Sequence, residues 1–220
     1  IRGLAHYSDP NIPAALLGRM GAFDELAKED MIAALSTRPD FARALLQSVR
    51  DGRLSARDIS AFHARQIASL GDDALQRELL EVWGEVRTSP REKKELIERH
   101  RAALTPDVIA KADSSAGRAV FQRVCANCHV LYGTGRRVGP DITGGNRQNL
   151  DYLLENIIDP SASVGSAFKT LVVVLNSGQV VNGVTVAETE RTLTLLTAKE
   201  SVTIDRREID EIATTSVSLM

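Results

Sequence analysis

Residues 125–129 of this 220-residue chain read Cys-Ala-Asn-Cys-His, and this stretch decides how the rest of the sequence is interpreted. We expect it at the end of a helix that Asp113 caps. Positions i, i+3 and i+4 of a helix share one face, so the thiols of Cys125 and Cys128 and the imidazole of His129 would point the same way. The sequence therefore places two nucleophilic sulfurs and one metal-ligating nitrogen side by side.

Such a trio suits the covalent attachment of a haem. Two thiols can form thioethers with the two vinyl groups of one haem, while the imidazole nitrogen meets its iron. Half of a zinc site is an alternative, but zinc takes four ligands, the chain has no further cysteine, and His6, His63 and His100 are isolated. A redox dithiol would need its cysteine at a helix start in a βαβ setting. The pattern favours one covalent haem c per chain over these two alternatives.

The first 112 residues are predicted to form a helical domain. Apolar side chains recur at helical spacing over 40–49, 55–70, 73–86 and 90–104. Gly52 is placed to end the first of these helices. Segments of this length are typical of stacked helical hairpins, so we expect a HEAT-like α-helical domain over residues 1–112.

The remaining residues, 113–220, change in texture along the chain. A Gly-rich loop spans 133–140, and a helix over 150–158 is ended by an Asp-Pro pair. Apolar residues then alternate with period two in four segments, 169–175, 180–186, 191–197 and 201–204. The predicted fold class is mainly α, with an antiparallel β-meander inserted at about 168–212. We expect this insertion to pack beside the haem fold and to contribute little to the iron site.

Two further motifs lie on either side of the Cys-x-x-Cys-His pattern. A Gly-x-x-x-Phe segment at 117–121 precedes the cysteines, and Gly139-Pro140-Asp141-Ile142 follows them. In these features residues 113–220 resemble class I cytochromes c. The resemblance implies that the Pro140 carbonyl accepts a hydrogen bond from His129 Nδ1, which fixes the ring and raises its basicity. It also places Ile142 beside the haem.

A narrower resemblance covers nearly the whole chain. It rests on residues 146–162, which run from Asn146 through Tyr152 to an Asp-Pro-Ser-Ala segment, and on the terminal Ser-Leu-Met at 218–220. These segments resemble the haem-binding domain, with its preceding helical repeats, of membrane-bound dehydrogenase-like proteins from Planctomycetes and Verrucomicrobia. The resemblance implies that Met220 is the sixth iron ligand and that Tyr152 belongs to the haem-binding set. A dehydrogenase domain or protein is then the expected electron donor.

Several other side chains carry weaker expectations. Arg136, Arg137 and Arg147 could pair with haem propionates, because a guanidinium matches a carboxylate, although loop arginines are also common without such a role. Met20 and Met31 lie on apolar helix faces and are expected in the core. His63 and His100 are expected to be packed or exposed histidines rather than ligands.

Charge and hydropathy exclude other classes of function. Lysine and arginine number 27 against 29 acidic residues, giving a net charge of −2 and a pI near 6.1, which argues against a nucleic-acid partner. The longest aliphatic run, Leu171–Leu175, is far shorter than the ~18 residues needed to cross a bilayer, so no transmembrane segment is expected. The start at Ile1 shows no export signal, so we expect any such signal to have been removed or to lie outside this chain.

The sequence thus predicts an electron-transfer module rather than an enzyme. One haem with filled axial positions would pass single electrons from a dehydrogenase partner to an acceptor that the sequence does not identify. Haem attachment by thioethers takes place outside the bacterial inner membrane, so a periplasmic or exported protein is expected. The alternatives are a haem peroxidase or gas sensor with an open sixth position, and a helical docking scaffold in which the haem domain is incidental.

Overall fold

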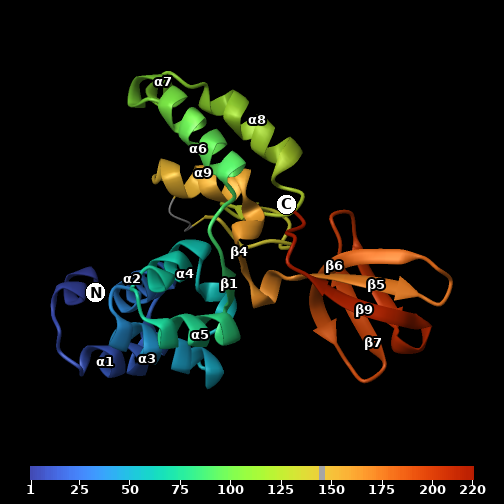
Figure 1. Ribbon diagram of the computed structural model, residues 1–220, viewed down its shortest axis with the longest axis horizontal. Helices are drawn as coiled ribbons and strands as arrows, with labels where there is room; N and C mark the ends of the chain where they lie inside the picture. The colour runs from blue at the N-terminus through green and yellow to red at the C-terminus, as the bar shows by residue number, and fades with distance from the viewer. Residues whose placement is uncertain (144–146) are drawn as a thin grey trace. The chain divides into compact units, whose positions relative to one another are not determined.

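A computed structural model describes residues 1–143 and 147–220 as a mixed α/β protein (Figure 1). It divides into two compact units, Ile1–Thr88 and Ser89–Met220. This boundary lies earlier than the one expected at residues 112 and 113. The helix after Thr88, α6 Arg91–Ala103, belongs to the second unit because it packs along α9 Leu150–Ile158.

The first unit is helical, as its apolar periodicity predicts. Its α-helices are α1 Ile12–Gly18, α2 Glu25–Leu35, α3 Pro39–Arg50, α4 Ala61–Ala68 and α5 Asp73–Val82. Short 3₁₀ turns at Arg2–His6, Met20–Ala22 and Ala56–Asp58 and a strand, β1 Gly84–Val86, complete it. Gly52, at φ +69°, ends α3 as expected.

The helix predicted over 55–70 is two elements. Ser55 and Asp58 form a capping box, but the turn it begins is a 3₁₀ turn of three residues. A second cap follows at once, because the Ser60 side chain accepts a hydrogen bond from the His63 amide and starts α4. The two caps explain why a single stretch of apolar residues at helical spacing forms two separate elements.

Aliphatic side chains fill the core of this unit. The fully buried members include Met31, as expected, whereas Met20 is only half-buried against the core. Trp83, the sole tryptophan of the chain, is buried, and its indole nitrogen donates to the Ile59 carbonyl at 2.7 Å. The polar edge of this large ring is therefore satisfied inside the core.

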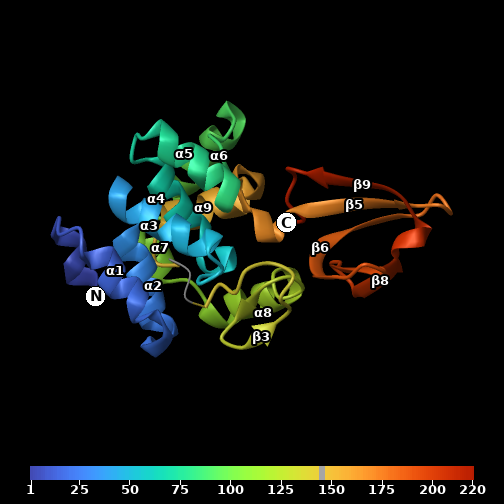
Figure 2. The same ribbon diagram turned by 90° about the horizontal axis from the view of Figure 1, so that it is seen from below.

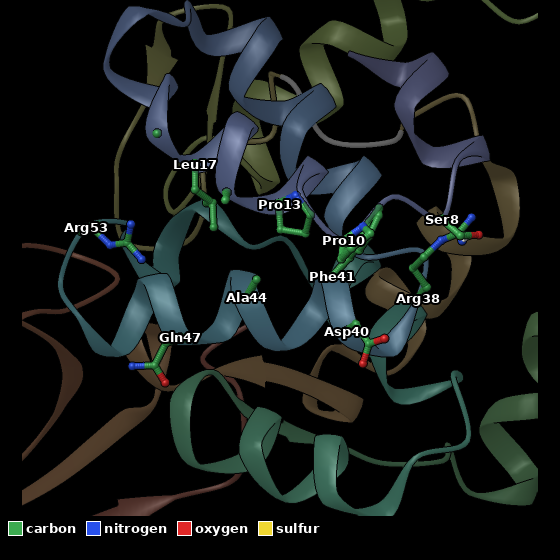
Figure 3. A pocket seen from close by; sticks show the side chains of 12 residues that line it. Ser8, Pro10, Pro13, Leu17, Arg38, Asp40, Phe41, Ala44, Gln47 and Arg53 are labelled. Carbon is green, nitrogen blue, oxygen red and sulfur yellow. Dashed lines mark hydrogen bonds between the residues drawn. The ribbon is translucent and has the colours of Figure 1, made fainter.

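An open groove of about 620 Å³ lies on this unit beside α1 and α3 (Figure 3). At one end Arg38 donates to the Ser8 hydroxyl at 2.6 Å and lies 5.3 Å from the centre of the Phe41 ring. The residues that line this groove include none of those expected to bind a cofactor.

The second unit begins with helices. They are α6 Arg91–Ala103, α7 Pro106–Ala110, α8 Ser114–Val124 and α9 Leu150–Ile158, and α9 has the predicted bounds. Between α8 and α9 a small hairpin pairs β2 Val130–Leu131 with β3 Thr134–Gly135. Helix α6 packs along α9 (Figure 1), where Lys93 donates to the Ile158 carbonyl and Arg101 pairs with Asp151 at 2.6 Å. His100, on α6, is exposed.

A five-stranded antiparallel sheet follows, after a 3₁₀ turn at Pro160–Ala162 and a short strand, β4 Ser163–Gly165. Its strands are β5 Thr170–Leu175, β6 Val180–Glu188, β7 Thr192–Leu196, β8 Ser201–Asp205 and β9 Ile209–Thr215, in the order β8-β7-β6-β5-β9. The four predicted strands are present. The fifth, β9, returns beside β5 and was not predicted as a separate strand.

The sheet curls around its own apolar core. Register shifts interrupt the β5–β9 pairing after Val174 and the β6–β7 pairing after Thr185, and such bulges increase the local twist. Figure 2 shows β5 and β9 on one side of the curl and β6 and β8 on the other. The buried core consists of Val173, Val181, Leu193, Leu195 and Ile204. The C-terminus lies where the sheet meets the helices of this unit (Figure 2).

A buried histidine makes the stability of the first unit depend on pH. Burial lowers the pKa of His63 from its ordinary value of 6.5 to about 4, while Ser60 Oγ lies 3.1 Å from Nδ1. Because the folded unit keeps this ring neutral, protons bind preferentially to the unfolded chain as the pH falls below 6.5. The contribution is complete above pH 6.5 and is lost by about pH 4, amounting to about 3 kcal/mol.

Urea unfolding followed by Trp83 fluorescence between pH 7 and pH 4 measures this loss. We expect His63→Gln to flatten the pH dependence by about 3 kcal/mol. His6→Gln, at an exposed histidine of the same unit, is the matched control. Equal pH profiles for the two variants would show that His63 does not carry the effect.

Candidate functional site

The attachment motif occupies a turn that follows α8 rather than α8 itself. The helix ends at Val124 with Cys125 as its C-cap, which corrects the prediction that the helix holds both cysteines. The amides of Cys128 and His129 then both donate to the Cys125 carbonyl, at 3.0 and 2.9 Å. These i+3 and i+4 bonds form one separate helical turn, so the expected spacing within the motif is retained.

The His129 ring is held by the loop that follows. Its Nδ1 donates to the Pro140 carbonyl at 2.9 Å, which is the hydrogen bond that the resemblance implied. The Gly139 amide donates to the Cys128 carbonyl at 2.8 Å and brings the loop against the motif. A Cβ on Gly139 would stand 2.6 Å from Cε1 of His129, so only glycine lets the backbone pass this close to the ring.

A second glycine lets the hairpin lie against the same turn. Gly135 has φ +114°, and a Cβ there would stand 2.1 Å from the His129 carbonyl oxygen. The next amide, of Arg136, donates to the Ala126 carbonyl at 3.0 Å. The segment from Gly135 to Pro140 therefore contacts both the backbone of the motif and its imidazole. The sequence showed this loop as Gly-rich, but local pattern gave no reason to single out Gly135.

Both cysteines are free thiols and are half-buried. Burial raises the pKa of the Cys128 thiol, the nearby Arg136 charge opposes that rise, and the sulfur of Cys125 adds to it. Burial therefore disfavours the thiolate form of Cys128.

Apolar surface lies uncovered next to this turn. Every residue of α8 except the half-buried Phe121 is exposed, although Asp113 caps the helix and its apolar positions share one face. Val120 and Val124, one turn apart, are 48% and 61% exposed. An amphipathic helix normally buries such a face, so this surface suits an apolar group bound beside Cys125.

The three loop arginines have protein partners. Arg147 Nη2 donates to the Tyr132 hydroxyl and the Thr143 carbonyl at 2.9 and 2.8 Å, and its guanidinium stacks 5.0 Å from the Tyr132 ring centre. Arg137 lies 3.7 Å from Asp141. Arg136 Nη1 donates to two carbonyls of the sheet, at residues 198 and 199. A role for any of them in pairing with propionates stays a prediction.

The other expected site residues differ in how firmly they are placed. Ile142 is half-buried, and its amide donates to the Val130 carbonyl at 2.9 Å. Tyr152 is half-buried on the first turn of α9, where the Asn149 side chain caps its amide. Met220 is 54% exposed, and its amide donates to Ser218 Oγ at 3.1 Å. Asn146, the first residue of the resemblance segment, lies outside the described residues.

Alanine substitutions at Gly139 and Gly117 should have opposite effects on local amide exchange, because of the two only Gly139 lies against another group. Gly139→Ala forces the ring or the loop to move, which should weaken the bond to Pro140 and speed amide exchange over residues 126–142 by about ten-fold or more. Gly117→Ala, inside α8 with nothing within 4 Å of the added Cβ, should instead slow exchange in α8, because alanine favours helix by about 0.5–1 kcal/mol. Hydrogen-exchange mass spectrometry measures both. Similar exchange over 126–142 in Gly139→Ala and the parent would contradict the close packing.

Within residues 1–143 and 147–220, no three His, Cys, Asp or Glu side chains gather where they could together hold a metal ion. No protein-family model matches this chain, and no curated protein matches it.

Proposed function

We propose that the second unit binds one covalent haem c through Cys125, Cys128 and His129 and transfers electrons. The observation that carries the proposal is the bond between His129 Nδ1 and the Pro140 carbonyl at 2.9 Å. A carbonyl can only accept, so Nδ1 bears the proton and Nε2 is left as the nitrogen that can ligate iron. The two thiols lie in the same single turn as this oriented imidazole.

The surroundings fit such a group. The absence of a side chain at Gly139 gives the ring its space, and the loop keeps the ring in one orientation. The exposed Val120 and Val124 supply apolar surface beside Cys125, where a porphyrin would bury it. Zinc would instead need four ligands, and the chain has no cysteine besides this pair.

When bound, the haem supplies a one-electron ferric–ferrous couple. The chain's own residues hold it in place, orient the axial imidazole and set that ligand's basicity through Pro140. Ile142 and Tyr152, both half-buried, are proposed to contribute to its surroundings. We propose a dehydrogenase domain or protein as electron donor and a separate, unidentified acceptor.

Haem attachment by thioethers also supports a periplasmic or exported location. None of the described helices is both long enough and apolar enough to cross a membrane.

A second candidate function concerns the sixth position of the iron. Met220 is proposed as that ligand, but it is 54% exposed, and its amide donates to Ser218 Oγ. This exposure favours, as the alternative, a haem with an open position that acts as a peroxidase or gas sensor.

The covalent link is tested by expressing the chain with a haem-attachment system. We expect the intact mass to exceed the polypeptide by one haem, and haem staining to survive denaturing electrophoresis. Cys125→Ala and Cys128→Ala should each leave a single thioether, and the double variant should lose the covalent haem. A colourless protein that contains zinc would contradict the proposal.

The sixth ligand is tested with Met220→Ala, and Leu219→Ala serves as the matched apolar control. If Met220 ligates iron, its replacement should lower the midpoint potential and give a high-spin haem that binds carbon monoxide, because a thioether stabilises ferrous iron. Leu219→Ala should keep the parent spectrum. Rapid carbon monoxide binding by the parent, unchanged in Met220→Ala, would favour the open-site alternative.

A further inference from the structure

Arg136 connects the Gly-rich loop at 133–140, the attachment loop, with the five-stranded sheet. Its Nη1 donates to the carbonyls of Ala198 and Lys199, at 2.8 Å each, in the turn between β7 and β8. These partners lie 62 and 63 residues further along the chain. A half-buried guanidinium that donates to two carbonyls forms charge-assisted bonds, which are stronger than neutral ones.

The turn that receives Arg136 is itself fixed. The Thr197 side chain accepts from the amides of Lys199 and Glu200, at 3.2 and 3.0 Å, and donates to the Glu200 carbonyl at 2.8 Å. The Thr197 amide donates to the same carbonyl at 2.9 Å. The strands on either side pair in register from Leu196 and Ser201 onward. The two carbonyls therefore form a preorganised acceptor site.

The other end of Arg136 lies on the attachment motif. Its amide donates to the Ala126 carbonyl, and the preceding Gly135 packs on the His129 carbonyl. Only three residues separate Arg136 from Pro140, whose carbonyl orients the imidazole. A displacement of Arg136 would therefore be passed along this short segment to the acceptor of the His129 hydrogen bond.

The neighbouring arginine provides a contrast. The Arg137 side chain is 76% exposed and lies 3.7 Å from Asp141, within its own loop. The two side chains carry the same charge and are adjacent in sequence, but Arg137 pairs within its loop whereas Arg136 reaches the sheet. Position rather than charge therefore distinguishes them.

We propose that Arg136 is a positioning residue that braces the attachment loop against the β7–β8 turn, so that the sheet helps to orient His129. The proposal rests on the proposed function only for its effect on a bound haem. It departs from the expectation that the inserted strands contribute little to the iron site.

The brace is first tested without reference to any cofactor. In Arg136→Met, amide exchange over residues 126–142 should speed up about ten-fold relative to the parent, because two charge-assisted bonds are lost. Arg137→Met should leave this exchange unchanged, and Arg136→Lys, which keeps the charge but not the planar guanidinium, should lie between. Equal exchange in Arg136→Met and Arg137→Met would overturn the proposal.

A second variant acts from the sheet and changes no charge. Thr197→Val removes the side-chain bonds that fix the turn, so it should reproduce part of the faster exchange over 126–142. Thr203→Val, which removes only the bond to Thr194 on the same pair of strands, is the control. Faster exchange confined to residues 196–201 in Thr197→Val would show that the turn does not brace the loop.

The haem-loaded protein provides the readout that a purely structural role would not move. A looser Pro140 acceptor makes the imidazole a poorer electron donor, which destabilises ferric iron, so Thr197→Val should raise the midpoint potential while Thr203→Val leaves it unchanged. An unchanged potential in Thr197→Val would limit the sheet to a role in folding. If no haem attaches to the parent chain, the proposed function fails, while the exchange results still decide whether the brace exists.

Discussion

The bond between His129 Nδ1 and the Pro140 carbonyl is the constraint around which the second unit is arranged. To make it, a loop must return within contact of the imidazole, and this is possible only because Gly139 has no side chain. The same return brings the Gly139 amide to the Cys128 carbonyl, so the backbone of the motif and its ring are fixed together. A metal ligand held in this way has one tautomer and one orientation before any metal arrives.

Local patterns predicted much of this fold, and the reason is physical. Helix α9 has its predicted bounds because Asn149 caps its start and an Asp-Pro pair ends it, all within the segment itself. Strands β5 to β8 of the five-stranded sheet were found because alternation with period two needs no knowledge of distant partners. The Cys-x-x-Cys-His motif was found from its spacing and forms one turn at 125–129, and its role in haem attachment stays a prediction.

Other features could not be found in this way. Helix α8 ends at Val124 because the amides of Cys125 and Ala126 both donate to the Phe121 carbonyl, and this competition between bonds leaves no mark in the residue pattern. The brace by Arg136 depends on carbonyls more than 60 residues away, and Arg136 and Arg137 look alike in sequence. Strand β9 pairs with β5 across three intervening strands, so its place depends on how the sheet closes.

The exposed face of α8 would link the proposed cofactor binding to the stability of this helix. Val120 and Val124 gain little from folding in the structure described, and α8 depends on its Asp113 cap and on the half-buried Phe121. A porphyrin seated beside Cys125 would cover part of that face, and full burial of each valine is worth about 1.5 kcal/mol or more. A covalently attached group stays on the unfolded chain too, so it stabilises the fold only through the apolar contacts that it makes in the folded state. If the haem binds as proposed, the motif that holds it would also supply the missing apolar partner of the helix before it.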